Sequence, residues 1–389
     1  MAISLGSPIS SLPLNTEMFG ESSAWNAAGA QLTNRTNLST EEWTQLEQLA
    51  YQYSASPETY DIMGSSCSLL RTPCGRGALS VLPDGRYWHV AGGLIASPHL
   101  KPDMIQWLKQ ISHEQRRTLL MYSISTTEVN AYREAGFSVN KFGEEPMLDL
   151  GQIDWKGGAF EWVRRQTNFC LRAGLAVQEI TCPVQQKEMS TELQEILTDD
   201  LSERVYSRPL RLLEGEFNPH LLHRRRLFVA RQQATGRVEG FLAASPMDGG
   251  KTWAFETYRK RSTAPKGTVP FLFRQVIDQL QSEGISQVSL CVVPGKGAQH
   301  DYTKQANPRI RWVMGFWYKH LNIIFNTAGQ DFFKSRFRPR YVDRFVCAFP
   351  NNSLLAVVSF IKTSGAMRPN LRNLAHKCFS RQPPSPVVE

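Results

Sequence analysis

The sequence has 389 residues, of which 41% are hydrophobic and 20% are charged, and this composition is that of a folded globular protein. The chain is too long for one ordinary domain and predicts two domains of about 150 to 200 residues each. Its formal net charge of +9 favours polyanions as partners, which include nucleic acids and anionic membranes.

The cysteine pattern argues against a disulfide framework and against a zinc site. The cysteines are odd in number and scattered, without a C-x-x-C pair or a His–Cys cluster at zinc spacing. We therefore expect a reduced, cytoplasmic protein with no structural metal. The residues are Cys67, Cys74, Cys170, Cys182, Cys291, Cys347 and Cys378.

The hydropathy pattern predicts no signal peptide and no membrane span. The N-terminus lacks a basic region before its short, broken apolar run. The longest apolar candidate, residues 353–361, is far shorter than the roughly 18 to 20 residues that span a bilayer. Contact with a membrane would then be peripheral. We expect residues 1–40 to be a flexible N-terminal segment and residues 367–389 to be a basic, Pro-rich tail.

Between these ends the same order of predicted elements occurs twice, as ββ(β)αβαβ, and this suggests a duplication. The first half has strands at 78–82, 87–91, 118–124, 137–142 and 146–150, and helices at 104–112 and 126–136. The second half has strands at 227–232, 238–245, 253–258, 287–293 and 345–349, and helices at 269–284 and 312–324. Helical segments at 158–174 and 191–203 connect the halves.

Residues 253–280 have the pattern of an anion site. A half-polar strand ends at a Pro/Gly turn, and a helix follows at once, with Thr268 expected as its N-cap and Pro270 in its first turn. The first amides of a helix lack internal partners and carry the positive end of its dipole, so a phosphate or carboxylate can bind there. The alternative is a solvated basic turn. The basic residues beside this turn are Arg259, Lys260, Arg261 and Lys266.

A mostly antiparallel sheet with flanking helices and an anion-binding helix start is the layout of the GNAT (N-acetyltransferase-like) fold. The chain also resembles the C-terminal domain of bacterial phosphatidylglycerol lysyltransferases, which has two tandem GNAT-like units. Five blocks in order support the resemblance, and together they cover roughly residues 78–366. They are Leu119–Leu150 with Phe142-Gly143-Glu144-Glu145; Trp155–Gly174 with Arg164, Arg165, Asn168 and Arg172; Glu214–Ala230; the anion-site block with Arg259, Ala264, Pro265 and Gly267; and Met314–Arg344.

The resemblance implies an α+β fold of two tandem GNAT-like units, with mixed, mostly antiparallel sheets flanked by helices. The first unit, with the connector helix, would span residues 41–182, and the second, which would hold the active site, residues 183–366. The implied reaction transfers an aminoacyl group from aminoacyl-tRNA to a hydroxyl of a lipid such as phosphatidylglycerol. Aminoacyl-tRNA would be a co-substrate, and no cofactor is needed.

An aminoacyl ester is already activated, so such an enzyme must mainly hold the lipid hydroxyl against the ester, exclude water and stabilise the oxyanion. Both substrates bring phosphates, which predicts a channel of Arg and Lys. The segment from Lys334 to Arg344 is rich in both and is interleaved with aromatics that suit base stacking or acyl-chain packing. The alternative is a solvated strand edge whose arginines cover an aromatic core.

The resemblance implies catalytic roles for Glu256, Arg259 and Lys334. We expect Arg259 and Lys334 to be exposed cations, whose loss would hardly change the stability of the fold. Glu256 would accept the hydroxyl proton or bind the substrate amine, unless it is simply paired with Arg259 or Lys260. No metal is expected. The implied substrate-binding residues are Lys266, Gly267, Thr268, Arg336, Arg338, Arg340, Arg344, Glu144 and Glu145.

Two departures from the family leave the amino acid and the acceptor open. We expect no membrane-embedded flippase region before these residues, and Pro270 and Glu256 stand where the family usually has Asp. Two other functions remain. An acyl-CoA-dependent N-acyltransferase could use the same helix start, although the loop at 262–268 lacks the Gly-rich form usual for CoA. A non-catalytic module could bind tRNA or anionic membrane through its basic face.

Overall fold

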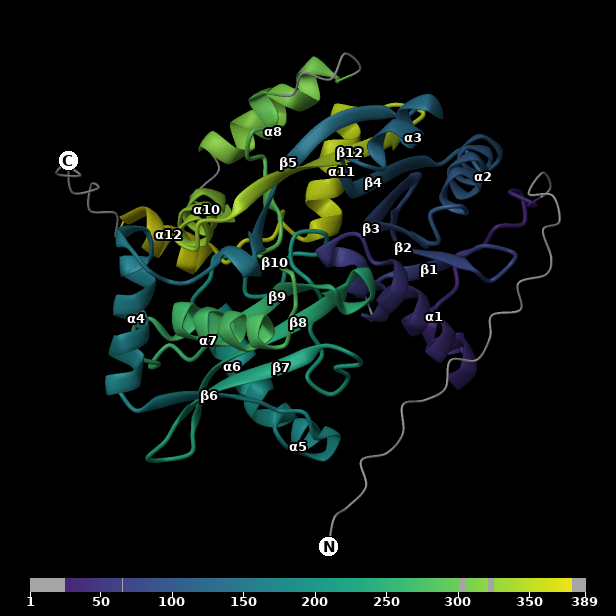
Figure 1. Ribbon diagram of the computed structural model, residues 1–389. Coiled ribbons are helices and arrows are strands. Elements are labelled where there is room, and N and C mark those ends of the chain that lie inside the picture. Colours follow the sequence, from purple (N-terminus) through teal and green to yellow (C-terminus); the bar gives the residue numbers. More distant parts are fainter. Residues whose placement is uncertain (1–24, 65, 301–305, 321–324, 380–389) are drawn as a thin grey trace, which may run out of the picture.

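The computed structural model describes residues 25–64, 66–300, 306–320 and 325–379 (Figure 1). Residues 1–24 of the expected flexible start and residues 380–389 of the expected Pro-rich tail lie outside the described residues. Residues 25–40 are mostly exposed, but several of them contact the rest of the protein. The flexibility expected for residues 1–40 stays a prediction. Ala27 is buried in the core, Thr33 pairs through its backbone with Leu69, and the buried Arg35 donates a hydrogen bond to the Ile62 carbonyl at 3.0 Å.

One twelve-stranded sheet runs through the described chain in the order β1-β2-β3-β4-β12-β5-β10-β9-β8-β7-β6, with β11 beside β5. Only the β3–β4 and β9–β10 pairs are parallel among the pairings of these strands. The strands are β1 Ser68–Arg71, β2 Gly77–Asp84, β3 Tyr87–Ala96, β4 Thr118–Ser125, β5 Ser138–Asp149, β6 Leu175–Glu179, β7 Arg226–Gln232, β8 Val238–Met247, β9 Thr252–Lys260, β10 Gln287–Ser289, β11 Val293–Pro294 and β12 Arg340–Phe349.

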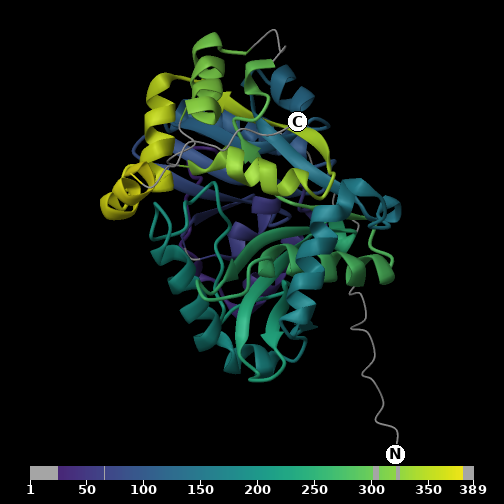
Figure 2. The same cartoon turned by 90° about the vertical axis from the view of Figure 1, so that its left-hand side faces the viewer.

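Helices cover both halves of this sheet (Figures 1 and 2). Helix α2 packs with α3 over the first half, and α7 packs with α4 over the second half, each around its own hydrophobic core. The helices are α1 Thr40–Tyr53, α2 Lys101–Glu114, α3 Val129–Glu134, α4 Glu161–Arg172, α5 Pro183–Glu188, α6 Ser190–Ser202, α7 Thr268–Ser282, α8 Pro308–His320, α10 Thr327–Ser335, α11 Leu354–Ser364 and α12 Leu371–Phe379, with a short 3-10 helix, η3, at Pro57–Met63.

The first part of the repeated element order, ββαβ, is confirmed. In each half two antiparallel strands lead into a helix, and the next strand returns parallel to the second one: β2-β3-α2-β4 in the first half and β8-β9-α7-β10 in the second. The protein therefore has the α+β class and the two GNAT-like units that the sequence indicated. The expected separate sheets are wrong, because β5 pairs with β10 and joins the two halves.

Strand β12 corrects the expected division of the chain. We expected it to close the second unit, but it lies between β4 and β5 of the first half, with Phe345 opposite Ile124 and Tyr341 opposite Pro146. Its last six residues are buried. An apolar strand that is buried on both faces fits either half equally well, so its hydrophobic pattern does not specify its neighbours. The boundary near residue 182 stays a prediction.

The C-terminal helix α11 is joined to the first half through His89. This fully buried side chain makes hydrogen bonds of 2.9 Å to Tyr122 and 2.8 Å to Ser359. Burial lowers the pKa of His89 to about 4. Between pH 6.5 and 4 the unfolded chain therefore binds a proton at this residue that the folded chain excludes, and stability falls as the pH falls through that window.

On going from pH 7 to pH 4, we expect the unfolding free energy of His89→Gln to fall by about 3 kcal/mol less than that of the parent protein. Urea unfolding at the two pH values measures this difference. The matched control is His113→Gln, which changes an exposed histidine on α2. An unchanged pH dependence in His89→Gln would show that the buried ring is not the titrating group.

Candidate functional site

A cavity of about 520 Å³ lies where β9 and β10 diverge. The two strands pair only from Thr252 to Ala254 on β9, while β9 itself continues to Lys260. After Ser289 the chain turns at Cys291, whose φ is +64°, and β11 then pairs with β5 instead. The second part of β9 is thus left without a strand neighbour on that side, and the residues of both strand ends line the cavity.

The start of α7 faces this cavity through Gly267, Val269 and Pro270. The expected N-cap is wrong by one residue. Gly267 is the N-cap, with φ +94°, because the chain must enter the helix in a left-handed conformation that glycine adopts without strain. Thr268 is instead the first helical residue, and its buried hydroxyl donates to the Pro265 carbonyl at 2.8 Å.

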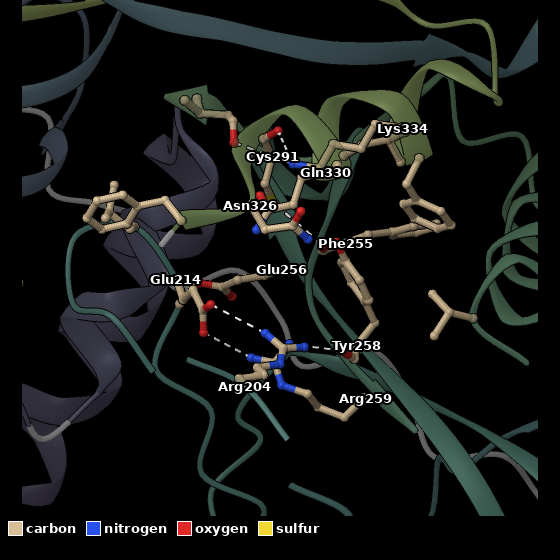
Figure 3. Close-up of a pocket in the computed structure, with 18 of the residues that line it drawn as sticks. Arg204, Glu214, Phe255, Glu256, Tyr258, Arg259, Cys291, Asn326, Gln330 and Lys334 are labelled. Carbon is tan, nitrogen blue, oxygen red and sulfur yellow. Dashed lines mark hydrogen bonds and ion pairs between the residues drawn. The ribbon is translucent and has the colours of Figure 1, made fainter. Parts of the chain in front are cut away.

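A partly buried ion-pair cluster forms one side of the cavity (Figure 3). The Glu214 carboxylate lies 3.1 Å from the Arg259 guanidinium and 3.5 Å from that of Arg204. Asp200 lies between the same two arginines, at 3.4 and 2.7 Å. Burial lowers the pKa of Arg259, although its two carboxylate partners oppose the shift. Arg259 is therefore a buried, paired cation rather than the exposed one that the sequence suggested.

Lys334 reaches the cavity from α10, on the other side from the arginines in Figure 3. Its side chain is buried, and its ammonium donates to the carbonyls of Cys291 at 2.9 Å and Val292 at 3.4 Å. Burial lowers the pKa of Lys334. Since an ammonium has three donors, two carbonyl contacts leave one donor for a group in the cavity.

Glu256 projects from β9 into the cavity and is almost fully buried. Its Oε2 accepts a hydrogen bond from Ser245 and lies 3.4 Å from Arg225. Its Oε1 is buried and has no hydrogen-bond partner among the described residues. A Cβ at Gly215 would lie only 1.9 Å from that oxygen, so the glycine gives Glu256 its room. The partner of Glu256 is thus Arg225, not the Arg259 or Lys260 considered from the sequence.

Two buried acidic groups near Glu256 were missed by the sequence analysis. Glu58, from η3, lines the cavity, and burial raises its pKa. Asp61, one turn later, has a pKa well above the ordinary value because of its burial and of the nearby charge of Glu256. Because these residues come from a short irregular segment in the first half, no periodic pattern pointed to them. Arg204 and Glu214 were likewise not singled out.

The basic segment after Lys334 does not line the cavity. Arg336 lies over the ring of Phe332 at 4.2 Å, while Arg338 and Arg340 are exposed. Arg338 donates to the carbonyl of Ala159 at 3.3 Å. The segment was predicted to form one channel, but its side chains point in different directions. The reason is that it runs from a helix end through a turn into a strand.

The remaining predicted residues also lie outside the cavity lining. Arg344 is buried and pairs with the fully buried Glu145, across β12 and β5. Glu144 pairs with Lys141 at 2.8 Å. Lys266 is exposed beside the start of α7.

Within the described residues, no group of three or more His, Cys, Asp or Glu side chains is arranged to hold a metal ion. In the same part of the chain, no helix is both long and apolar enough to cross a bilayer.

The fold matches two solved structures with a TM-score of 0.70 each. One is the C-terminal domain of a protein named as a lysylphosphatidylglycerol synthetase from Agrobacterium fabrum, with 20% identity, covering 85% of this chain and 99% of the other. The second is named L-PGS, from Bacillus licheniformis, with 18% identity, covering 84% of this chain and 96% of the other. At these identities the likeness shows the fold.

Comparisons of the sequence find proteins of the same kind as the two solved structures. A bifunctional lysylphosphatidylglycerol biosynthesis protein, LysX, of Rhodococcus jostii is 22% identical over 321 residues, which are 80% of this chain and 28% of that protein. The chain thus spans less than a third of the length of the curated relatives that it matches. The profile of the family described as "Phosphatidylglycerol lysyltransferase, C-terminal" matches residues 47–348, and the chain belongs to that family.

Proposed function

We propose that the chain is the catalytic part of an aminoacyl-tRNA-dependent transferase that moves an aminoacyl group onto a hydroxyl of phosphatidylglycerol. The observation that supports this most is the content of one cavity. It has a buried ammonium with a donor to spare, Lys334, a buried carboxylate oxygen without a partner, on Glu256, and the start of α7. Family membership supports the same reaction class.

In this reaction the lipid hydroxyl oxygen bonds to the ester carbonyl carbon, and the bond from that carbon to the terminal ribose oxygen of the tRNA breaks. The hydroxyl gives up one proton and the ribose oxygen takes one, so the step is balanced. The oxyanion that forms in between needs a donor that is already in place. Lys334 meets this need, because the carbonyls of Cys291 and Val292 fix its ammonium before substrate arrives.

Glu256 would bind the amine of the aminoacyl group through Oε1. Its other oxygen is already used by Ser245 and Arg225, which hold the carboxylate in position. Arg204 and Arg259, with the start of α7, would face the phosphates that both substrates bring. The cavity volume of about 520 Å³ is in the range of small-molecule sites, so it suits an aminoacyl end and a headgroup rather than a folded tRNA.

We expect Glu256→Gln to raise the apparent KM for aminoacyl-tRNA by roughly tenfold or more, with a smaller effect on kcat, since a charge-assisted hydrogen bond to the amine is lost. Steady-state kinetics with varied aminoacyl-tRNA measure this. Glu144→Gln is the control, because it alters a carboxylate outside the cavity. A loss confined to kcat would assign Glu256 to proton transfer instead.

A second candidate is an acyl-CoA-dependent N-acyltransferase, which the exposure of the α7 start to the cavity also favours. Lipid extracts of cells that express the protein, stained for amines, separate the candidates. The proposed reaction gives a new amine-positive lipid that Lys334→Met does not produce. An unchanged lipid profile, together with acetyl-CoA consumption by the purified protein, would support the second candidate.

A further inference from the structure

Helix α8 presents aromatic side chains to solvent. Ile310, Met314 and Trp317 face inward and are buried, which leaves the opposite side of the helix exposed. On that side Trp312 is 66% exposed and Phe316 41%, and their rings stack with centroids 5.3 Å apart. Two large aromatics in this position remain in water unless something covers them.

Helix α11 packs beside α8 (Figures 1 and 2) and exposes aliphatic side chains. Leu354, Leu355 and Val358 are 47%, 63% and 54% exposed. The inner sides of α8 and α11 contribute to the same hydrophobic core, so the two outer sides both point away from the sheet. We call the five exposed side chains, Trp312, Phe316, Leu354, Leu355 and Val358, the α8–α11 face.

The sequence around this face has no negative charge. No Asp or Glu occurs from residue 302 to 330 or from residue 344 to 388. Arg309, Arg311 and Lys319 are exposed on α8. An apolar stripe flanked by cations, with aromatics between them, is the pattern of helices that lie in the interface of an anionic bilayer.

The α8–α11 face is close to the cavity. On the inner side of α8, Trp317 stacks on Phe325 with ring centroids 4.0 Å apart. Phe325 lines the cavity, and so does Asn326 at the start of α10. A partner bound to this face would therefore be separated from the cavity wall only by helix α8.

We propose that the α8–α11 face docks on the surface of an anionic lipid bilayer, so that the headgroup of a bilayer lipid is presented near the cavity. This use of the face rests on the proposed function, whereas the docking itself does not. The phosphates of a tRNA would also meet the cations, and its bases could stack on Trp312. The aliphatic Leu354, Leu355 and Val358 favour the bilayer, because they offer no ring for base stacking and gain by leaving water.

The test uses two double variants, Trp312→Ser with Phe316→Ser, and Leu355→Ser with Val358→Ser. All four side chains are exposed, so the fold is expected to be kept, which circular dichroism checks. The matched control is Phe169→Ser with Leu171→Ser, two hydrophobics of α4 that are 45% and 52% exposed. Flotation measures binding to vesicles of phosphatidylglycerol and phosphatidylcholine, and to vesicles of phosphatidylcholine alone.

We expect each face variant to bind the anionic vesicles about tenfold or more weakly, since apolar area no longer enters the interface. The control should bind like the parent, and the parent should prefer anionic vesicles and bind less as salt rises. Parent-like vesicle binding by both face variants would overturn the docking proposal. So would a loss of tRNA binding in a gel-shift assay without any loss of vesicle binding.

Transfer assays separate this proposal from the proposed function. With phosphatidylglycerol dispersed in detergent micelles, docking is bypassed, and the face variants should transfer at the parental rate while failing on vesicles. If the parent binds anionic vesicles through the α8–α11 face but transfers nothing in micelles, the proposed function fails and the docking proposal stands.

Discussion

Lys334→Met should lower the rate of aminoacyl transfer by about 10²-fold or more, because it removes a preorganised cation from the position where the oxyanion forms. The folded state should be largely kept. Methionine has a similar shape, and the substitution ends the burial of a charge. Transfer of label from aminoacyl-tRNA to lipid measures the rate, and a thermal melt checks the fold.

Lys266→Met is the control for Lys334, since it removes an exposed lysine next to the start of α7 and outside the cavity lining. We expect it to keep most of the activity. The pH dependence gives an independent check. Burial lowers the pKa of Lys334, so its ammonium loses its proton at a lower pH than that of an exposed lysine. As the pH rises, transfer should therefore decline before exposed lysines lose their protons. A Lys334→Met variant with the parental rate would remove Lys334 from the mechanism.

Arg259→Ala should lower the unfolding free energy by about 3 kcal/mol or more, because it leaves the carboxylates of Asp200 and Glu214 with one buried cation fewer. Arg204 still contacts both carboxylates, which limits the loss. Urea unfolding measures it. The sequence had suggested an exposed Arg259 whose removal would hardly affect stability. That expectation is wrong, since only 6% of the side chain is accessible.

Arg340→Ala provides the comparison for Arg259→Ala. Its side chain is 46% exposed and pairs with Asp149 at 3.0 Å, and exposed ion pairs of this kind contribute about 0 to 1 kcal/mol. Equal destabilisation by the two variants would contradict the view that the ion pairs of the buried Arg259 with Asp200 and Glu214 hold the cavity wall together.

The local structure of the site could be predicted from its sequence. The change from an alternating pattern to a helical one between Trp253 and Leu280 correctly predicted β9, the turn and α7. The cap was misplaced because a threonine next to a glycine satisfies the usual N-cap preference, whereas the left-handed entry into the helix requires the glycine. Glu256 and Lys334, taken from the family pattern, do meet at one cavity.

The parts that could not be predicted depend on long-range contacts. Glu58 comes from a 3-10 turn in the first half, and Glu214 from an irregular segment, so neither follows a periodic pattern. The arginines after Lys334 were grouped by their density along the chain, which does not show the direction of each side chain. The position of β12 in the sheet depends on which strands it pairs with, and the apolar sequence of a buried strand does not specify those neighbours.

The proposed reaction transfers an aminoacyl group from tRNA to a lipid hydroxyl. Its most direct test incubates the purified protein with tRNA charged with labelled lysine, or another labelled amino acid, and with phosphatidylglycerol in detergent micelles. We expect the label to move into the organic phase as an aminoacyl lipid, and Lys334→Met to reduce this transfer by about 10²-fold. The proposed reaction is wrong if the folded parent protein produces no labelled lipid with any of the charged tRNAs, so that the label stays on tRNA or appears only as free amino acid.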